Sequence, residues 1–117
     1  MSTEQQEYVL EGVSVTEVTE EIEKVWGQLQ QPNSEFAKLA VEKGVNADEL
    51  ESLRKYSLEE VLVLKKGGGF DPVTVALIVA FAPVAAKITK DVWDNFILGR
   101  LQRRFGKNAI APKEDKH

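Results

Sequence analysis

The chain has 117 residues and a net charge of −4, which suits a single domain whose hydrophobic core is large enough to fold without disulfides. It contains no cysteine, and its one histidine is the terminal His117. Thiolate chemistry, a histidine-dependent triad and a histidine-based metal site are therefore excluded, because a chain end does not hold a general base in place.

Charge is distributed unevenly along the chain. Residues 1–64 carry 14 acidic and 5 basic side chains, whereas residues 65–117 carry 5 acidic and 10 basic side chains. The two halves should attract each other. A basic surface that contacts an anionic partner is the alternative explanation.

The N-terminal segment, residues 1–13, is acidic and polar, and we expect it to be flexible. Within it, Tyr8-Val9-Leu10 could form a short edge strand or pack as an anchor.

A first helix is expected at 15–30. Ser14 followed by Glu17 has the form of a capping box, and Pro32-Asn33 ends the pattern. Apolar residues at helical spacing predict a stripe that packs either on the rest of the domain or on a second copy in a dimer. Its members are Val15, Val18, Ile22, Val25, Trp26 and Leu29.

Residues 34–43 and 47–55 predict two short helices joined at Gly44, with Asn46 and Glu49 capping the second. This outline resembles DNA-binding helix-turn-helix units. The second helix, however, presents Asp48, Glu49 and Glu51, whose carboxylates would repel phosphates. We therefore expect a structural hairpin and no nucleic-acid partner, and we keep a degenerate regulator as an alternative.

A fourth helix is expected at 58–66, where Ser57 and Glu60 form another capping box. The run Val61-Leu62-Val63-Leu64 also fits a buried strand. We expect a hinge at the glycines that follow, which are Gly67, Gly68 and Gly69.

The order of an acidic helical region, a double glycine and a hydrophobic, cationic segment resembles precursors with a double-glycine leader, as found in bacterial peptide toxins. The resemblance implies cleavage at Gly67–Gly69. Lys65 and Lys66 stand where such leaders usually carry an apolar residue.

A long helix is expected at 72–105, opened by Asp71 and Pro72 and kinked near Pro83. Its uncharged run of 15 residues, 72–86, is shorter than the roughly 20 residues that cross a bilayer, which favours the centre of a soluble core. Basic residues near its end predict a contact with an anionic partner, and they are Arg100, Arg103, Arg104 and Lys107.

Together these patterns predict an all-α domain at 14–107, in which four short helices pack on one long C-terminal helix, followed by a flexible tail at 108–117. We expect a small, non-enzymatic cytoplasmic protein without cofactor or metal that acts by protein–protein contact or self-association. The alternatives are a membrane-associated protein that inserts the 72–105 helix at an anionic surface, and the peptide precursor.

Overall fold

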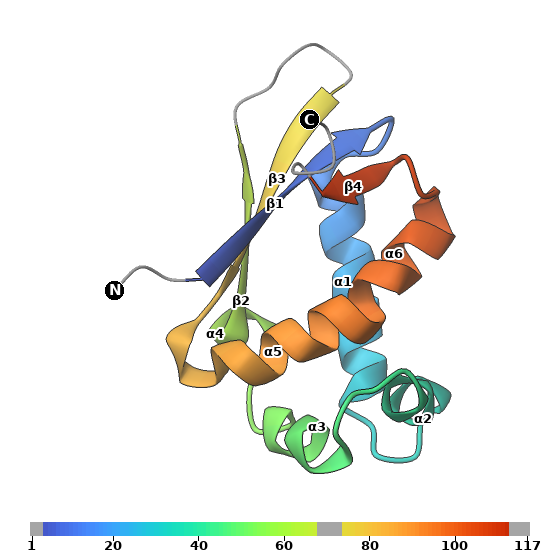
Figure 1. Cartoon of the computed structure of the whole chain (residues 1–117), viewed down its shortest axis with the longest axis vertical. Coiled ribbons are helices and arrows are strands. Elements are labelled where there is room, and N and C mark those ends of the chain that lie inside the picture. Colours follow the sequence, from blue (N-terminus) through green and yellow to red (C-terminus); the bar gives the residue numbers. More distant parts are fainter. Residues whose placement is uncertain (1–3, 68–73, 113–117) are drawn as a thin grey trace.

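The apolar run after Pro72 forms a β-strand, and the protein is a mixed α/β fold instead of the predicted all-α helical bundle. The computed structural model describes residues 4–67 and 74–112. One antiparallel sheet has the strand order β2-β3-β1-β4 (Figure 1). Its strands are β1 (Glu4–Glu11), β2 (Leu62–Lys66), β3 (Thr74–Phe81) and β4 (Ile110–Pro112).

Strand β3 explains why the long helix was wrongly predicted. It pairs with β1 along one edge and with β2 along the other. A strand in this position is apolar on both faces, and such a run has no period that separates it from a buried helix. Thr74, Val75, Ile78 and Val79 are β-branched, which favours the extended backbone that the strand adopts.

Pro83 does not kink a helix, because it begins one. It is the first residue of a 3₁₀ turn, η1 (Pro83–Ala85), where its missing N–H breaks no hydrogen bond. The turn leads into α5 (Ala86–Val92), a π-helical stretch η2 (Trp93–Ile97) and α6 (Leu98–Phe105). Gly106 ends this helix with a φ of 112°, a conformation that suits glycine.

The first three predicted helices are confirmed, with ends within two residues of the prediction. They are α1 (Val15–Leu29), α2 (Glu35–Glu42) and α3 (Ala47–Leu53). The predicted caps are present: Ser14 Oγ accepts a hydrogen bond from Glu17 N at 3.1 Å, and Asn46 Oδ1 accepts one from Glu49 N at 3.1 Å. The fourth helix is wrong beyond its first turn, α4 (Leu58–Val61), because the alternative strand, β2, follows it.

Residues 4–11, placed in a flexible segment from the sequence, form β1, an inner strand of the sheet. The strand is fastened to the helical layer by a buried hydrogen bond, in which Trp93 Nε1 donates to the Tyr8 hydroxyl at 2.6 Å. The two rings also contact each other, with centroids 5.7 Å apart. The folded unit therefore includes β1 and β4, which lie outside the predicted boundaries at 14 and 107.

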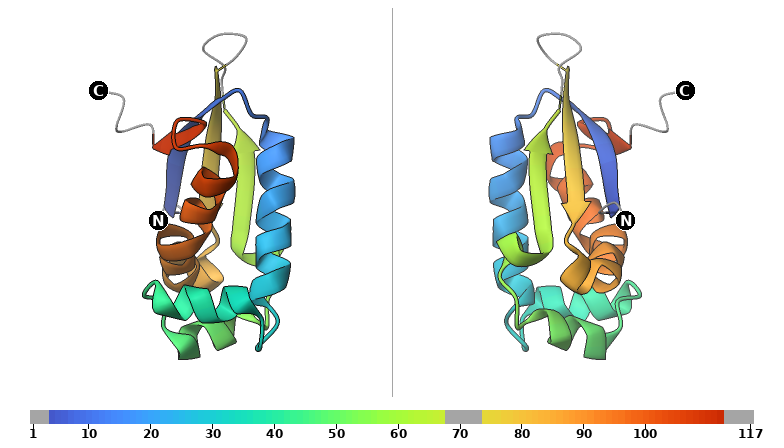
Figure 2. Two further views of the ribbon diagram at one scale, coloured as in Figure 1. Left: turned by 90° about the vertical axis from the view of Figure 1, so that its right-hand side faces the viewer. Right: turned by 90° about the vertical axis from the view of Figure 1, so that its left-hand side faces the viewer.

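Helices α1, α5 and α6 pack against one face of the sheet, and α2 and α3 close one end of that layer (Figure 2). Side chains alternate along each strand, so that every second residue enters this core. On β3 these residues are Val75, Leu77, Val79 and Phe81. Their partners in the core from other strands include Tyr8, Leu10, Leu62 and Ile110.

The two halves of the chain alternate across the sheet. Strands β1 and β2 come from residues before 68, and β3 and β4 come from residues after 73. In the order β2-β3-β1-β4, each inner strand has both of its neighbours from the other half. If either half of the chain were removed, the two strands of the other half would have no strand to pair with.

The alternation of β3 side chains between the two faces of the sheet is tested by placing the same carboxylate at two adjacent positions. Val79→Asp buries an unpaired charge at a fully buried position, which costs several kcal/mol and should unfold the domain or lower its Tm steeply. Ile78→Asp, on the opposite face of the strand, should leave a folded protein. Thermal unfolding followed by circular dichroism measures both variants, and equal effects would contradict the alternation.

Candidate functional site

Among the described residues, no helix covers the second face of the sheet, which lies open in the right-hand view of Figure 2. We call it the outer face. It carries the residues that alternate with the core residues on each strand. They are Gln5, Glu7, Val9 and Glu11 on β1, Val63 and Lys65 on β2, Ala76, Ile78 and Ala80 on β3, and Ala111 on β4.

The outer face combines small apolar residues with charges placed on opposite sides of β3. The register sets Lys65 beside Ile78 and Ile78 beside Glu7, so that one row runs from a cation through an apolar residue to a carboxylate. The flanking residues of β3, Ala76 and Ala80, are small. A second layer can therefore approach the middle of the face closely.

The exposed apolar surface of this face comes mainly from Val63 and Ile78. Val63 is 40% exposed, and Ile78 is half-buried. Ala76 and Ala80 are 4% and 8% exposed, yet they lie outside the hydrophobic core cluster. Val9, on the same face, is only 7% exposed, so the apolar surface that is open to solvent here is limited to Val63 and Ile78.

Gly67 lies just beyond β2, and its backbone is held in place by pairing with β3. Its N–H donates to the carbonyl of Ala76 at 2.8 Å, which continues the ladder between β2 and β3. A Cβ at this position would lie 2.8 Å from Cβ of Ala76, closer than side chains approach. Glycine is therefore required by close packing here. The other two residues of the predicted hinge, Gly68 and Gly69, lie outside the described residues.

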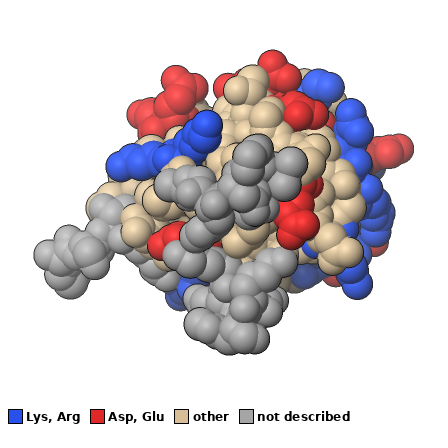
Figure 3. All heavy atoms as spheres, turned by 90° about the horizontal axis from the view of Figure 1, so that it is seen from above, with Lys and Arg blue, Asp and Glu red and all other residues tan. Residues whose placement is uncertain are grey.

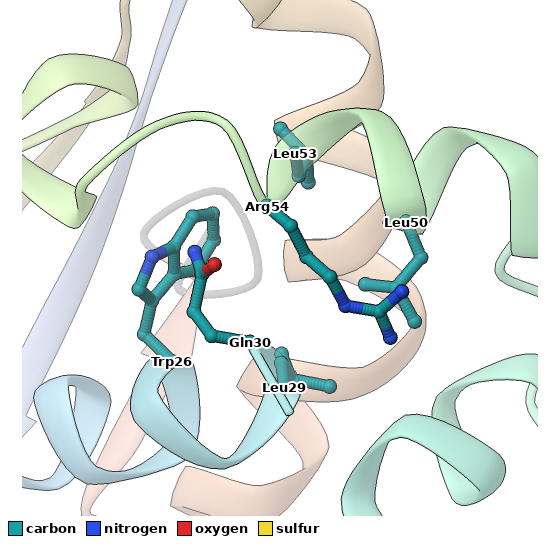
Figure 4. A pocket seen from close by; sticks show the side chains of 6 residues that line it. All are labelled: Trp26, Leu29, Gln30, Leu50, Leu53 and Arg54. Carbon is teal, nitrogen blue, oxygen red and sulfur yellow. The ribbon is translucent and has the colours of Figure 1, made fainter. Parts of the chain in front are cut away.

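A second feature is a hollow between the end of α1 and the segment after α3. Figure 4 shows Trp26 and Arg54 on its two sides, with Gln30 between them. Gln30 Nε2 donates to the carbonyl of Tyr56 at 3.0 Å, which ties α1 to that segment. Leu29, Leu50 and Leu53 complete the lining.

Two polar atoms at this hollow are buried without a hydrogen-bond partner in the described structure, namely Trp26 Nε1 and Arg54 Nε. Both are donors, so the group that satisfies either of them must be an acceptor. The partly open space between the two residues has room for about one water molecule and is too small for a larger ligand.

Within residues 4–67 and 74–112, no group of three or more histidine, cysteine, aspartate or glutamate side chains is arranged to hold a metal ion. A separate, shallow depression that shares Trp26, Gln30 and Arg54 with the hollow carries charges of both signs, from Glu23, Glu59, Glu60, Arg54 and Lys55.

The four basic residues predicted to meet an anionic partner lie at the end of α6 and just beyond it, and two of them contact the protein itself. Arg100 lies over the ring of Phe36, 4.6 Å from its centroid. Arg104 Nε is 3.9 Å from a carboxylate oxygen of Glu21 on α1. Arg103 and Lys107 are exposed. Figure 3 shows basic side chains gathered on the side of the molecule where α6 lies. A contact with an anionic partner stays a prediction.

The apolar stripe of α1 faces the core of its own chain. Val18, Ile22, Val25, Trp26 and Leu29 are buried there, and Val15 is partly buried against them. The structure thus places these residues in helix packing within one chain. The outer face was missed because it exists only once the sheet is formed. The available signal was the apolar run Val61-Leu62-Val63-Leu64, which fits a strand as well as a helix.

In the part of the chain that the structure describes, no helix combines the length and the apolar character needed to cross a membrane. Comparisons with protein families, with curated proteins and with solved structures found no match for the chain.

The two roles of the basic residues can be separated by matched substitutions. Arg100→Gln removes the contact with Phe36 and should lower the free energy of unfolding by about 0.5–1 kcal/mol. Arg103→Gln, on the exposed side of the same helix, should change it by less than about 0.5 kcal/mol. Urea unfolding measures both values. If the two variants lose equal stability, the packing role of Arg100 is contradicted.

Proposed function

We propose that this chain is a small, non-enzymatic interaction module that acts by protein–protein contact, and that the outer face of its sheet is the contact surface. The observation that carries the proposal is the one-sided cover of the sheet, whose helices pack on the core face (Figure 2). Apolar residues are left on the other face, around Ile78 and Val63.

The physical support comes from how sheets bury their faces. A sheet that carries apolar side chains on both faces gains stability by covering both, and a second sheet or a helix is the usual cover. On the outer face, Ala76 and Ala80 of β3 flank Ile78, and their small side chains project little from the centre of the sheet. Lys65 and Glu7 at the sides would give a partner a defined orientation through charge.

The membrane alternative required a helix at residues 74–81, where the structure has a strand. The predicted insertion needed one helix over 72–105, whereas residues 74–81 form a paired strand and the helix starts after it. Extraction of β3 into a bilayer would break its hydrogen bonds with both neighbours, and a backbone in lipid must satisfy its own polar groups.

The precursor alternative is disfavoured by the alternation of the two halves in the sheet. Cleavage at Gly67–Gly69 and release of the second part would remove β3 from between β2 and β1. The released part would leave β1 and β2 without partners, and its own two strands, β3 and β4, do not pair with each other.

The two helices that the helix-turn-helix alternative requires are present, but the second helix carries negative charge where DNA would bind. Helices α2 and α3 are present on either side of Gly44. Asp48 and Glu49 lie in the first turn of α3, the part that would approach DNA, and their carboxylates oppose binding to phosphates.

The proposal is tested by a photoreactive amino acid placed on the outer face. Incorporation at position 78, in cells that produce the protein, should yield a covalent adduct with another polypeptide after irradiation. The matched control is position 41, where Val41 is 44% exposed on α2 and away from the sheet. Adducts at 78 and none at 41 are expected. Absence of an adduct at 78, or equal adducts at both positions, would overturn the proposed surface.

A further inference from the structure

We infer that a partner protein contributes an extended, acidic segment, which pairs with the free edge of β2 and becomes an additional strand of the sheet. The inference rests on the proposed function, because it names how a partner reaches the outer face. It is carried by the unpaired backbone of β2 and by Lys65 and Lys66 at the end of this strand.

Strand β2 lies at one edge of the sheet, where β3 is its neighbour among the described strands. Two hydrogen bonds at the ends of their ladder show which residues of β2 bond to β3. The Gly67 N–H donates to the carbonyl of Ala76 at 2.8 Å, and the Ala82 N–H donates to the carbonyl of Val61 at 2.9 Å. The odd-numbered residues of this stretch therefore bond toward β3.

The even-numbered residues of β2 direct their backbone groups away from β3. Bonding alternates along an antiparallel ladder, so Val63 and Lys65 bond to β3, whereas Leu62, Leu64 and Lys66 face the free edge. The N–H of Leu62 is used by α4. In the part of the chain that the structure describes, no hydrogen bond reaches the carbonyl of Leu62 or the N–H and carbonyl groups of Leu64 and Lys66. Such a row is a template for another strand.

The free edge is accessible to another chain. Lys65 and Lys66 are exposed, Val63 is 40% exposed and Leu64 is half-buried. Helix α1 lies past this edge on the core side of the sheet in both views of Figure 2. A strand added about 4.8 Å from β2 would have α1 behind it, and its other side would continue the outer face beside Val63.

Charge indicates which segment fits this edge. Lys65 lies on the outer face and Lys66 on the opposite face, so that a paired segment meets a cation on each of its two sides. Within the described residues, neither lysine takes part in an ion pair. Opposite charges on neighbouring strands attract each other, and like charges repel. We therefore expect carboxylates on the segment opposite both lysines.

The direction of the segment follows from the rest of the sheet. All pairs of strands are antiparallel, and this arrangement is slightly more stable per residue than a parallel one. The beginning of an antiparallel segment lies opposite Lys65 and Lys66, and its end lies toward Glu59 and Glu60 in α4. These glutamates disfavour carboxylates there. The segment should thus begin with acidic residues and continue with β-branched ones, which favour strands.

A second copy of β2 is disfavoured as the occupant of the edge. In the antiparallel register that overlaps two β2 strands fully, Leu64 pairs with its own copy. The two Lys65 side chains then become diagonal neighbours on the outer face, roughly 7–8 Å apart. Lysines on an edge strand oppose uncontrolled pairing between copies in this way, and an acidic segment removes the repulsion.

The first test is amide hydrogen exchange, measured by NMR with a peptide probe. In the free protein, exchange should be slow at Val63 and Lys65, which bond to β3, and fast at Leu64 and Lys66. The probe is a capped hexapeptide with the sequence Glu-Glu-Val-Val-Thr-Val. At a concentration that occupies about nine-tenths of the protein, it should slow exchange at Leu64 and Lys66 about tenfold, because only the free tenth then exchanges.

Two altered peptides separate backbone pairing from charge. N-methylation of the amides that face β2 keeps both glutamates and removes the hydrogen bonds, and replacement of the glutamates by lysine does the reverse. Both peptides should bind at least about tenfold more weakly than the probe. Equal binding of the N-methylated peptide would contradict strand addition, and equal binding of the lysine peptide would contradict an acidic segment. Slow exchange at Leu64 and Lys66 in the free protein, or no change with the probe, would overturn the inference.

A matched pair of variants tests the same edge in the protein. Lys66→Pro removes an N–H that points away from β3, an orientation in which an edge strand tolerates proline. Lys66→Ala removes the same charge and keeps the N–H. Circular dichroism confirms that both variants are folded. Lys66→Pro should weaken probe binding at least about tenfold more than Lys66→Ala does, and equal effects would contradict pairing through this amide.

The photoreactive amino acid at position 78 separates this inference from the proposed function. Placed in the Lys66→Pro variant, it should give fewer adducts than in the wild-type background, because the partner enters through the edge of β2. Unchanged adducts would overturn strand addition and would leave the outer face as a contact surface. Absence of adducts in the wild-type background, with Leu64 and Lys66 still protected by the probe, would remove the proposed surface and leave the edge of β2 as the binding site.

Discussion

The structure depends on the position of β3 between β1 and β2. This strand supplies hydrogen bonds to partners from the first half of the chain along both of its edges. Its core-facing side chains, among them Leu77, Val79 and Phe81, are fully buried under the helices. Because β3 is hydrogen-bonded along both edges, its position determines which residues face the helical layer and which lie on the outer face.

Local signals predicted the helices of the first half well. Capping residues such as Ser14 and Asn46 act within one turn of their own helix, so their effect is legible in the sequence without tertiary structure. The strands were a different problem. Residues 75–81 are apolar throughout because both faces of β3 carry apolar residues, and β1 is a largely polar segment whose strand conformation depends on pairing with β3.

The outer face could not be predicted before the sheet was known. Lys65, Ile78 and Glu7 come from three strands, and they form one row only through the register of two ladders. Arg100, Arg103 and Arg104 lie on α6 and Lys107 just beyond it, and their contact with an anionic partner stays a prediction. The sequence contained no sign that Arg100 would stack on Phe36 or that Arg104 would approach Glu21, since these contacts join distant segments.

The central claim is that Ile78 and Val63 lie on a surface that a protein partner can reach. Methyl NMR with a soluble paramagnetic probe measures this directly, because the probe broadens the signals of methyl groups that it can reach. In dilute protein, the signals of Ile78 and Val63 should broaden, as should those of Val41, which is 44% exposed on α2, whereas those of the fully buried Leu77 and Val79 should stay sharp. Signals of Ile78 and Val63 that stay as sharp as those of Leu77 and Val79 would contradict the account.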